Sequence, residues 1–75
     1  MNKENSKIKM LAIERMFQTK RHLSMRDIID TLERRYDIKA DRRTVYDDIA
    51  CLTMFMNIQT EGGGRYLRYY LAEME

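Results

Sequence analysis

Apolar residues recur at helical spacing through most of the chain, in three stretches that precede a glycine-rich turn. The third stretch carries an apolar stripe at i, i+4, i+7 and i+11, made by Val45, Ile49, Leu52 and Met56. Asp41 precedes this stripe, where its carboxylate can cap a helix by accepting from a backbone N–H of the first turn. We therefore predict a helix over about residues 41–56, ended by Asn57 in the left-handed conformation.

The first stretch predicts a helix over about residues 6–19 with two apolar stripes. One stripe comprises Ile8, Leu11, Ala12 and Met16, and the second, on nearly the opposite side, comprises Met10, Ile13 and Phe17. A helix that is apolar on two sides is usually buried on both. The second stripe either meets a partner subunit or missing domain, or lies under the C-terminal strands, and the sequence favours neither.

The second stretch predicts a helix over about residues 24–35 with a well-marked start. Ser24 suits the N-cap, and Asp27 stands three residues later, as in a capping box. Leu23 and Ile28 occupy the positions of a hydrophobic staple. The buried side is predicted to hold Met25, Ile28, Ile29 and Leu32, with Tyr36 and Ile38 filling the following turn.

The last part of the chain has the alternation of a β-hairpin. Residues 58–61 and 65–71 flank three consecutive glycines at 62–64, which is a hairpin signal. Leu67, Tyr69 and Leu71 share the side expected to pack on the helices, and Tyr66, Arg68 and Tyr70 share the other. Three helices followed by a hairpin predict a mainly α fold, the winged helix-turn-helix, in a single domain over residues 1–75 with its wing at about 57–72.

The side of the third predicted helix opposite its apolar stripe suits the major groove of DNA. It begins with two arginines and continues with small and polar side chains: Arg42, Arg43, Thr44, Asp47 and Ala50, with Tyr46 on the flank. In helix-turn-helix proteins, the N-terminal residues of the second helix of the motif contact the base edges. An ordinary surface helix often begins in the same way, so this motif does not settle the matter by itself.

Charge changes this picture little. The chain of 75 residues has a net charge of +2, which is only mildly basic for a nucleic-acid binder. Its basic residues fall in three groups: Lys20, Arg21, His22 and Arg26; Arg34, Arg35, Lys39, Arg42 and Arg43; and Arg65 with Arg68. Acidic residues interrupt the first two groups, as they do on an ordinary solvated surface.

The chain offers no constellation for catalysis. His22 and Cys51 are the single histidine and cysteine, so we expect no enzyme, no catalytic residue, no metal site and no cofactor. Cys51 is interpreted as a small filler beside the core, and His22 as a solvent residue. No apolar run approaches the roughly 18 residues of a membrane span, and the N-terminus lacks a signal-peptide core. We expect a cytoplasmic protein with no membrane partner.

Residues 23–32 and 36–49 resemble the N-terminal winged helix of bacterial WYL-domain transcriptional regulators. They are also similar, more loosely, to the DeoR-type and biotin-repressor-type helix-turn-helix. The most specific part is Arg42–Tyr46 followed by Asp48 and Ile49, and the glycine turn before Arg65 is similar to the family's wing. This resemblance implies sequence-specific binding of double-stranded DNA, with Arg42, Arg43, Thr44 and Tyr46 on the DNA side.

The chain departs from the family pattern in two places. Asp47 stands where the family has an arginine, and it could accept from a cytosine amino group or pair with Arg43 four residues earlier. The glycine expected after the third helix is missing, which leaves the angle of the wing open. The family's C-terminal effector-sensing domain is also missing, so the chain is either a fragment or a stand-alone domain.

These observations lead to two hypotheses. In the first, Arg43 contacts a base and Arg42 a phosphate, while Thr44, Tyr46 and Asp47 complete the DNA side of the helix. Arg65 and Arg68 are assigned to the DNA backbone or minor groove, and Ser24 and Arg26 to the DNA backbone near the second helix. Binding is expected to need a homodimer, and the missing C-terminal domain is one candidate for its interface. In the second, the winged helix is a protein-interaction or oligomerisation module without DNA binding, as the weak net charge and Asp47–Asp48 suggest.

Overall fold

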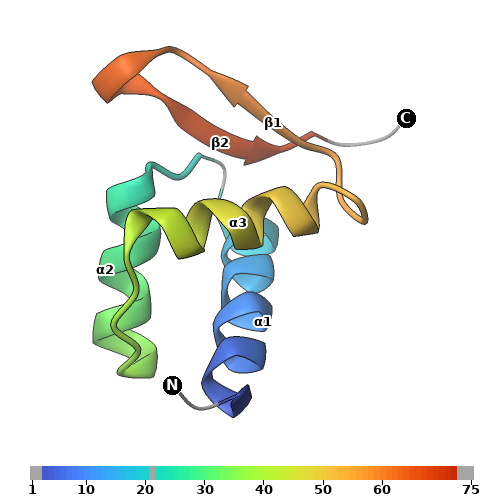
Figure 1. The fold of residues 1–75 in the computed structure, drawn as a ribbon. Coiled ribbons are helices and arrows are strands. Elements are labelled where there is room, and N and C mark those ends of the chain that lie inside the picture. Colours follow the sequence, from blue (N-terminus) through green and yellow to red (C-terminus); the bar gives the residue numbers. More distant parts are fainter. Residues whose placement is uncertain (1–2, 21, 73–75) are drawn as a thin grey trace.

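The computed structural model describes residues 3–20 and 22–72, and the side chains of residues 6–20 and 22–72. Its elements are α1 (Lys3–Thr19), α2 (Met25–Tyr36), α3 (Arg42–Leu52), β1 (Ile58–Glu61), the 3-10 helix η1 (Gly64–Tyr66) and β2 (Arg68–Leu71). Figure 1 shows α3 crossing over α1 and α2, with the hairpin lying along the other side of α3. The predicted fold class is confirmed: the chain is mainly α, with three helices followed by an antiparallel hairpin in a winged-helix order.

All three helices contribute to one hydrophobic core. Its buried members are Ala12, Ile13, Met16 and Phe17 of α1, Ile28 and Leu32 of α2, Val45, Ile49 and Leu52 of α3, and Leu23, Ile38, Ile58 and Tyr69 outside the helices. Because α1 contacts α2, α3 and β2, its second stripe is covered by its own chain. The first stripe is only partly buried, since Ile8 and Leu11 remain 46% and 63% exposed.

The capping box predicted for α2 is confirmed. The Ser24 hydroxyl accepts from the Asp27 backbone N–H at 3.0 Å, and the Asp27 carboxylate accepts from the Ser24 N–H at 3.0 Å. The helix ends at Tyr36, one residue later than predicted. Asp37 caps it in the left-handed conformation, with φ of 56°, and donates its N–H to the carbonyl of Leu32. Asp is among the few non-glycine residues that tolerate this conformation.

The predicted end of α3 is wrong. The helix ends at Leu52, and Thr53 caps it in the right-handed conformation rather than Asn57 in the left-handed one. The next residues, Met54 and Phe55, are 80% and 81% exposed, so extending the helix through them would bury little apolar surface. Most helical stability in proteins comes from packing, and the chain turns here instead. α1, by contrast, begins at Lys3, three residues before its predicted start.

The hairpin forms with a shorter second strand than predicted. β1 pairs with β2 from Ile58 opposite Leu71 to Glu61 opposite Arg68. β2 begins at Arg68 rather than at residue 65, because Gly64–Tyr66 form the turn of 3-10 helix. Gly62 makes this turn possible: its φ is +77°, and an added Cβ would lie 2.5 Å from the Tyr66 carbonyl oxygen.

Backbone hydrogen bonds tie the hairpin to the helices. The N–H of Leu23 donates to the Tyr69 carbonyl at 2.9 Å, and the N–H of Tyr69 donates to the Leu23 carbonyl at 2.8 Å. Tyr69 itself is buried and Leu67 and Leu71 are half-buried on the predicted inner side, but Arg68 and Tyr70 on the predicted outer side are half-buried as well, so the strand is less one-sided than predicted. The start of α2 and the middle of β2 are therefore held next to each other.

Candidate nucleic-acid interface

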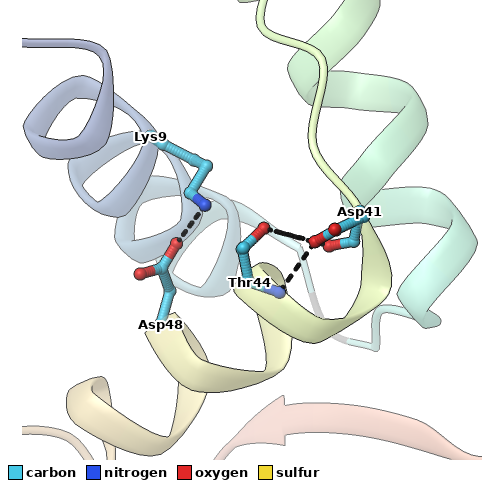
Figure 2. A network of polar contacts seen from close by, with 4 residues as sticks. All are labelled: Lys9, Asp41, Thr44 and Asp48. Atoms are coloured by element: carbon cyan, nitrogen blue, oxygen red, sulfur yellow. Dashed lines mark hydrogen bonds and ion pairs between the residues drawn. The ribbon is translucent and has the colours of Figure 1, made fainter. Parts of the chain in front are cut away.

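The first turn of α3 is fixed by Asp41. Its Oδ1 accepts from the Thr44 backbone N–H at 2.9 Å and from the Thr44 hydroxyl at 2.8 Å, as Figure 2 shows. These two hydrogen bonds lower the pKa of the Asp41 carboxyl, because they stabilise its charged form. The cap predicted at Asp41 is confirmed, and it orients the N-terminal end of α3, where Arg42 and Arg43 lie.

The outward side of α3 is a row of exposed residues. Its members are Arg42, Arg43, Tyr46, Asp47 and Ala50, which lie opposite the buried Val45, Ile49 and Leu52. Neither arginine forms an ion pair or a side-chain hydrogen bond with any other side chain that the structure describes. Tyr46 is 59% exposed. The outward side thus presents two guanidinium groups and a phenol to solvent.

Thr44 is placed differently from its neighbours. It is half-buried, and its hydroxyl donates to the Asp41 carboxylate. The hydroxyl hydrogen is therefore committed within the protein, and the part left for an outside contact is the rest of the side chain. Of the residues expected on the DNA side, Arg42, Arg43, Tyr46 and Asp47 lie together on the outward side, and Thr44 lies at its edge.

Of the two adjacent acidic residues on α3, Asp48 is the one that forms an ion pair. Its carboxylate lies 3.1 Å from the ammonium of Lys9 on α1, and the two side chains are only 16% and 10% exposed (Figure 2). This contact is an ion pair without the alignment of a hydrogen bond. Asp47 is exposed, and no ion pair between Asp47 and Arg43 is present. Sequence reasoning missed Lys9, since a lysine within an apolar stretch gives no sign of its partner.

The wing presents one arginine more openly than the other. Arg65 lies in η1 and is exposed, as is Tyr66 beside it at 72%. Arg68 is half-buried, and its guanidinium donates to the Leu67 carbonyl at 3.0 Å. Tyr66 was not predicted as a site residue, although the alternation of the expected strand placed it on the outer side.

The wing and α3 form a continuous surface. A groove between them is lined by Tyr46, Ile49, Ala50 and Thr53 of α3 and its C-cap, and by Ile58, Thr60, Leu67 and Tyr69 of the hairpin region. Burial raises the pKa of Tyr69; nearby Tyr46 raises it further, and Arg42 lowers it. Tyr46 and Tyr69 line the same groove, so the middle of β2 lies close to α3 on the side where Tyr46 is exposed.

Of the two residues predicted to contact DNA near the start of α2, one is hydrogen-bonded within the protein and the other is exposed. The Ser24 hydroxyl is committed to the capping box, whereas Arg26 is exposed. His22 is exposed as predicted, but it also contacts the wing. Its Nε2 lies 3.3 Å from the Glu61 carboxylate, and its ring centre lies 5.2 Å from that of Tyr70.

Chemistry of other kinds is sparse in the described part of the chain. Cys51 is a half-buried free thiol on α3. Among residues 6–20 and 22–72, no three His, Cys, Asp or Glu side chains gather as a metal site. The described helices are all too short or too polar to cross a membrane.

No family model matches the chain, and no curated protein or solved structure matches it.

Proposed function

We propose that this chain binds double-stranded DNA in a sequence-specific manner, as the DNA-binding domain of a bacterial transcriptional regulator in the cytoplasm. The observation that carries the proposal is the outward side of α3. Arg42 and Arg43 are exposed there at the start of a helix whose opposite side is buried, and they have no described partner. A helix fits the major groove, and arginine is suited to both phosphate and guanine.

The hairpin supports the same proposal. It lies along α3, so a duplex against the outward side of α3 would meet the wing as well (Figure 1). Arg65 and Tyr66 are the exposed residues at its tip. We assign Arg43 to a base, Arg42 to a phosphate and Arg65 to the backbone or minor groove.

The small net charge of +2 predicts modest affinity for one module. Each phosphate contact also makes binding weaken with salt, because cations leave the DNA when the protein binds. Two copies on adjacent half-sites, about one helical turn apart, would supply the affinity that one copy lacks.

The test is a fluorescence-anisotropy titration of mixed-sequence duplex at about 50 and 200 mM salt. The parent is compared with Arg42→Ala/Arg43→Ala. A matched control is Arg34→Ala/Arg35→Ala, which removes the same charge from two exposed arginines in the last turn of α2. We expect salt-sensitive binding by the parent and the control, and a loss of at least tenfold in the α3 variant.

Two outcomes would contradict the proposal. Equal losses in both double variants would mean that net charge, and not α3, attracts the DNA. Failure of the folded parent to bind at the lower salt concentration would remove the DNA role from this chain as it stands.

A second candidate function is a protein-interaction module, favoured by a specific observation. Met54 and Phe55 follow α3 and are 80% and 81% exposed, a pair of large apolar side chains in adjacent positions. Exposed apolar surface of this kind often marks contact with another protein. Absence of DNA binding, with a parent that remains folded, would favour this alternative.

A further inference from the structure

The outward side of α1 carries apolar residues that the core does not use. Ile8 and Leu11 are 46% and 63% exposed. They line a shallow groove together with Glu14, Arg15 and Gln18 of α1 and Tyr36 of α2. Single exposed apolar residues are normal on any protein surface, so the groove alone does not identify an occupant.

Charged residues beside the groove favour a second copy of this chain as its occupant. Lys7 and Glu14 flank Leu11 on α1, seven residues apart and therefore on nearly the same side of the helix. They carry opposite charges. If a second α1 packs antiparallel, with Ile8 opposite Leu11 of the other copy, Lys7 of each copy lies near Glu14 of the other. A helix with this pattern is complementary to itself.

We propose that the Ile8–Leu11 side of α1 is a contact between two copies of this chain, packed antiparallel about a twofold axis. A twofold interface uses the same patch on both subunits, so each apolar contact and each charge pair occurs twice. The proposal does not depend on DNA binding.

The position of the patch leaves α3 open. On the same helix, Lys9 faces α3 and pairs with Asp48. Leu11 lies two residues further on, about 200° around the helix at roughly 100° per residue, and so points away from α3. A dimer through this side would keep both copies of Arg42 and Arg43 exposed.

The contact is small, so the dimer is weak. A stable interface typically buries about 800 Å² on each partner, more than one short helix supplies. We expect dissociation constants in the micromolar range or weaker, with a monomer–dimer equilibrium visible at high protein concentration.

The experiment is analytical ultracentrifugation of the 75-residue chain without DNA. Lys7→Glu and Glu14→Lys are each expected to weaken self-association roughly tenfold, because like charges then face each other twice. An equimolar mixture of these two variants should associate as well as the parent, since every carboxylate then meets an ammonium. The doubly reversed chain should recover in the same way.

Two further variants locate the contact. Leu11→Asp should abolish association, because it places a charge at the centre of the patch. Met54→Asp makes the same kind of change at a more exposed apolar residue outside the patch and should leave association unchanged. The proposal is overturned if the parent stays monomeric at every concentration, if the mixture associates no better than its components, or if Met54→Asp has the effect of Leu11→Asp.

Discussion

The two sides of α3 differ in how completely the rest of the molecule occupies them. Val45, Ile49 and Leu52 on the inward side are at most 5% exposed and pack in the core. On the outward side, Arg42 and Arg43 are exposed and form no ion pair or side-chain hydrogen bond with a described residue. The inward side therefore fixes the helix in place, while the outward side is available for another molecule.

Two adjacent acids make the same comparison at the level of single residues. Asp48 lies at the border of the inward side and pairs with Lys9 at 3.1 Å, whereas Asp47 is exposed. The two side chains are identical, but only Asp48 is placed where it can hold α3 against α1. On the proposed function, the other is left to discriminate between bases.

The largest expected difference is between Ile49→Ala and Tyr46→Ala. Truncating Ile49 removes buried side-chain atoms and leaves a cavity, which is expected to lower the free energy of unfolding by about 4 kcal/mol. Tyr46 is 59% exposed, so its truncation should change that free energy by less than about 1 kcal/mol. Urea denaturation measures both, and similar losses would mean that the two sides are equally structural.

A somewhat smaller difference separates Asp48→Ala from Asp47→Ala. The first leaves the Lys9 ammonium buried without its partner and should lower the free energy of unfolding by about 3 kcal/mol. The second should lower it by less than about 0.5 kcal/mol.

The double variant Lys9→Met/Asp48→Leu completes this test of the ion pair. It replaces both charges by apolar side chains of similar size and should recover most of the lost stability. If Asp48→Ala is as stable as the parent, the ion pair does not hold α3 on α1.

In the wing, Gly62→Ala is expected to cost about 1–3 kcal/mol, because the residue has a positive φ and its Cβ would meet the Tyr66 carbonyl. Gly63→Ala is the matched control, since its backbone is extended and an added Cβ meets nothing within 4 Å. Hydrogen exchange of the β2 amides would show the loss in the first variant alone. Equal protection in both variants would mean that the turn does not depend on Gly62.

The smallest effect concerns pH. Hydrogen bonds from Thr44 lower the pKa of Asp41 below its ordinary value of 3.8, so its charged form stabilises the folded chain above that pH. This contribution decreases as pH falls through the folded-state pKa. The stability difference between the parent and Asp41→Asn, measured by thermal unfolding, should therefore shrink between pH 7 and strongly acidic pH. A difference that grows on acidification would contradict the assignment.

Local signals in the sequence predicted the starts of α2 and α3 well. Ser24 with Asp27, and Asp41 with the apolar stripe after it, are short-range patterns that act within one helical turn. The end of α3 was missed because Met56 continues the apolar stripe of Val45, Ile49 and Leu52, whereas in the structure Met56 packs against the core from the turn that follows the helix. Only the tertiary structure shows that Met54 is exposed.

Contacts between residues far apart in the sequence could not be predicted, because they also depend on the tertiary structure. Nothing near Lys9 indicates that Asp48, 39 residues later, neutralises it. The candidate site was predicted in outline, since the helical period places Arg43 and Asp47 opposite Val45. The helical period does not show that the Thr44 hydroxyl donates to the Asp41 carboxylate, because that hydrogen bond depends on the geometry of the cap.

The most direct test of the account is a map of amide chemical shifts on adding duplex DNA to the isotopically labelled chain. The account predicts that perturbations concentrate on the outward side of α3, around Arg42, Arg43 and Tyr46, and at the tip of the wing. The inward residue Ile49 and the patch around Leu11 should change little. Perturbations confined to the loop at Met54 and Phe55, or to α1, would contradict the claim that α3 faces DNA.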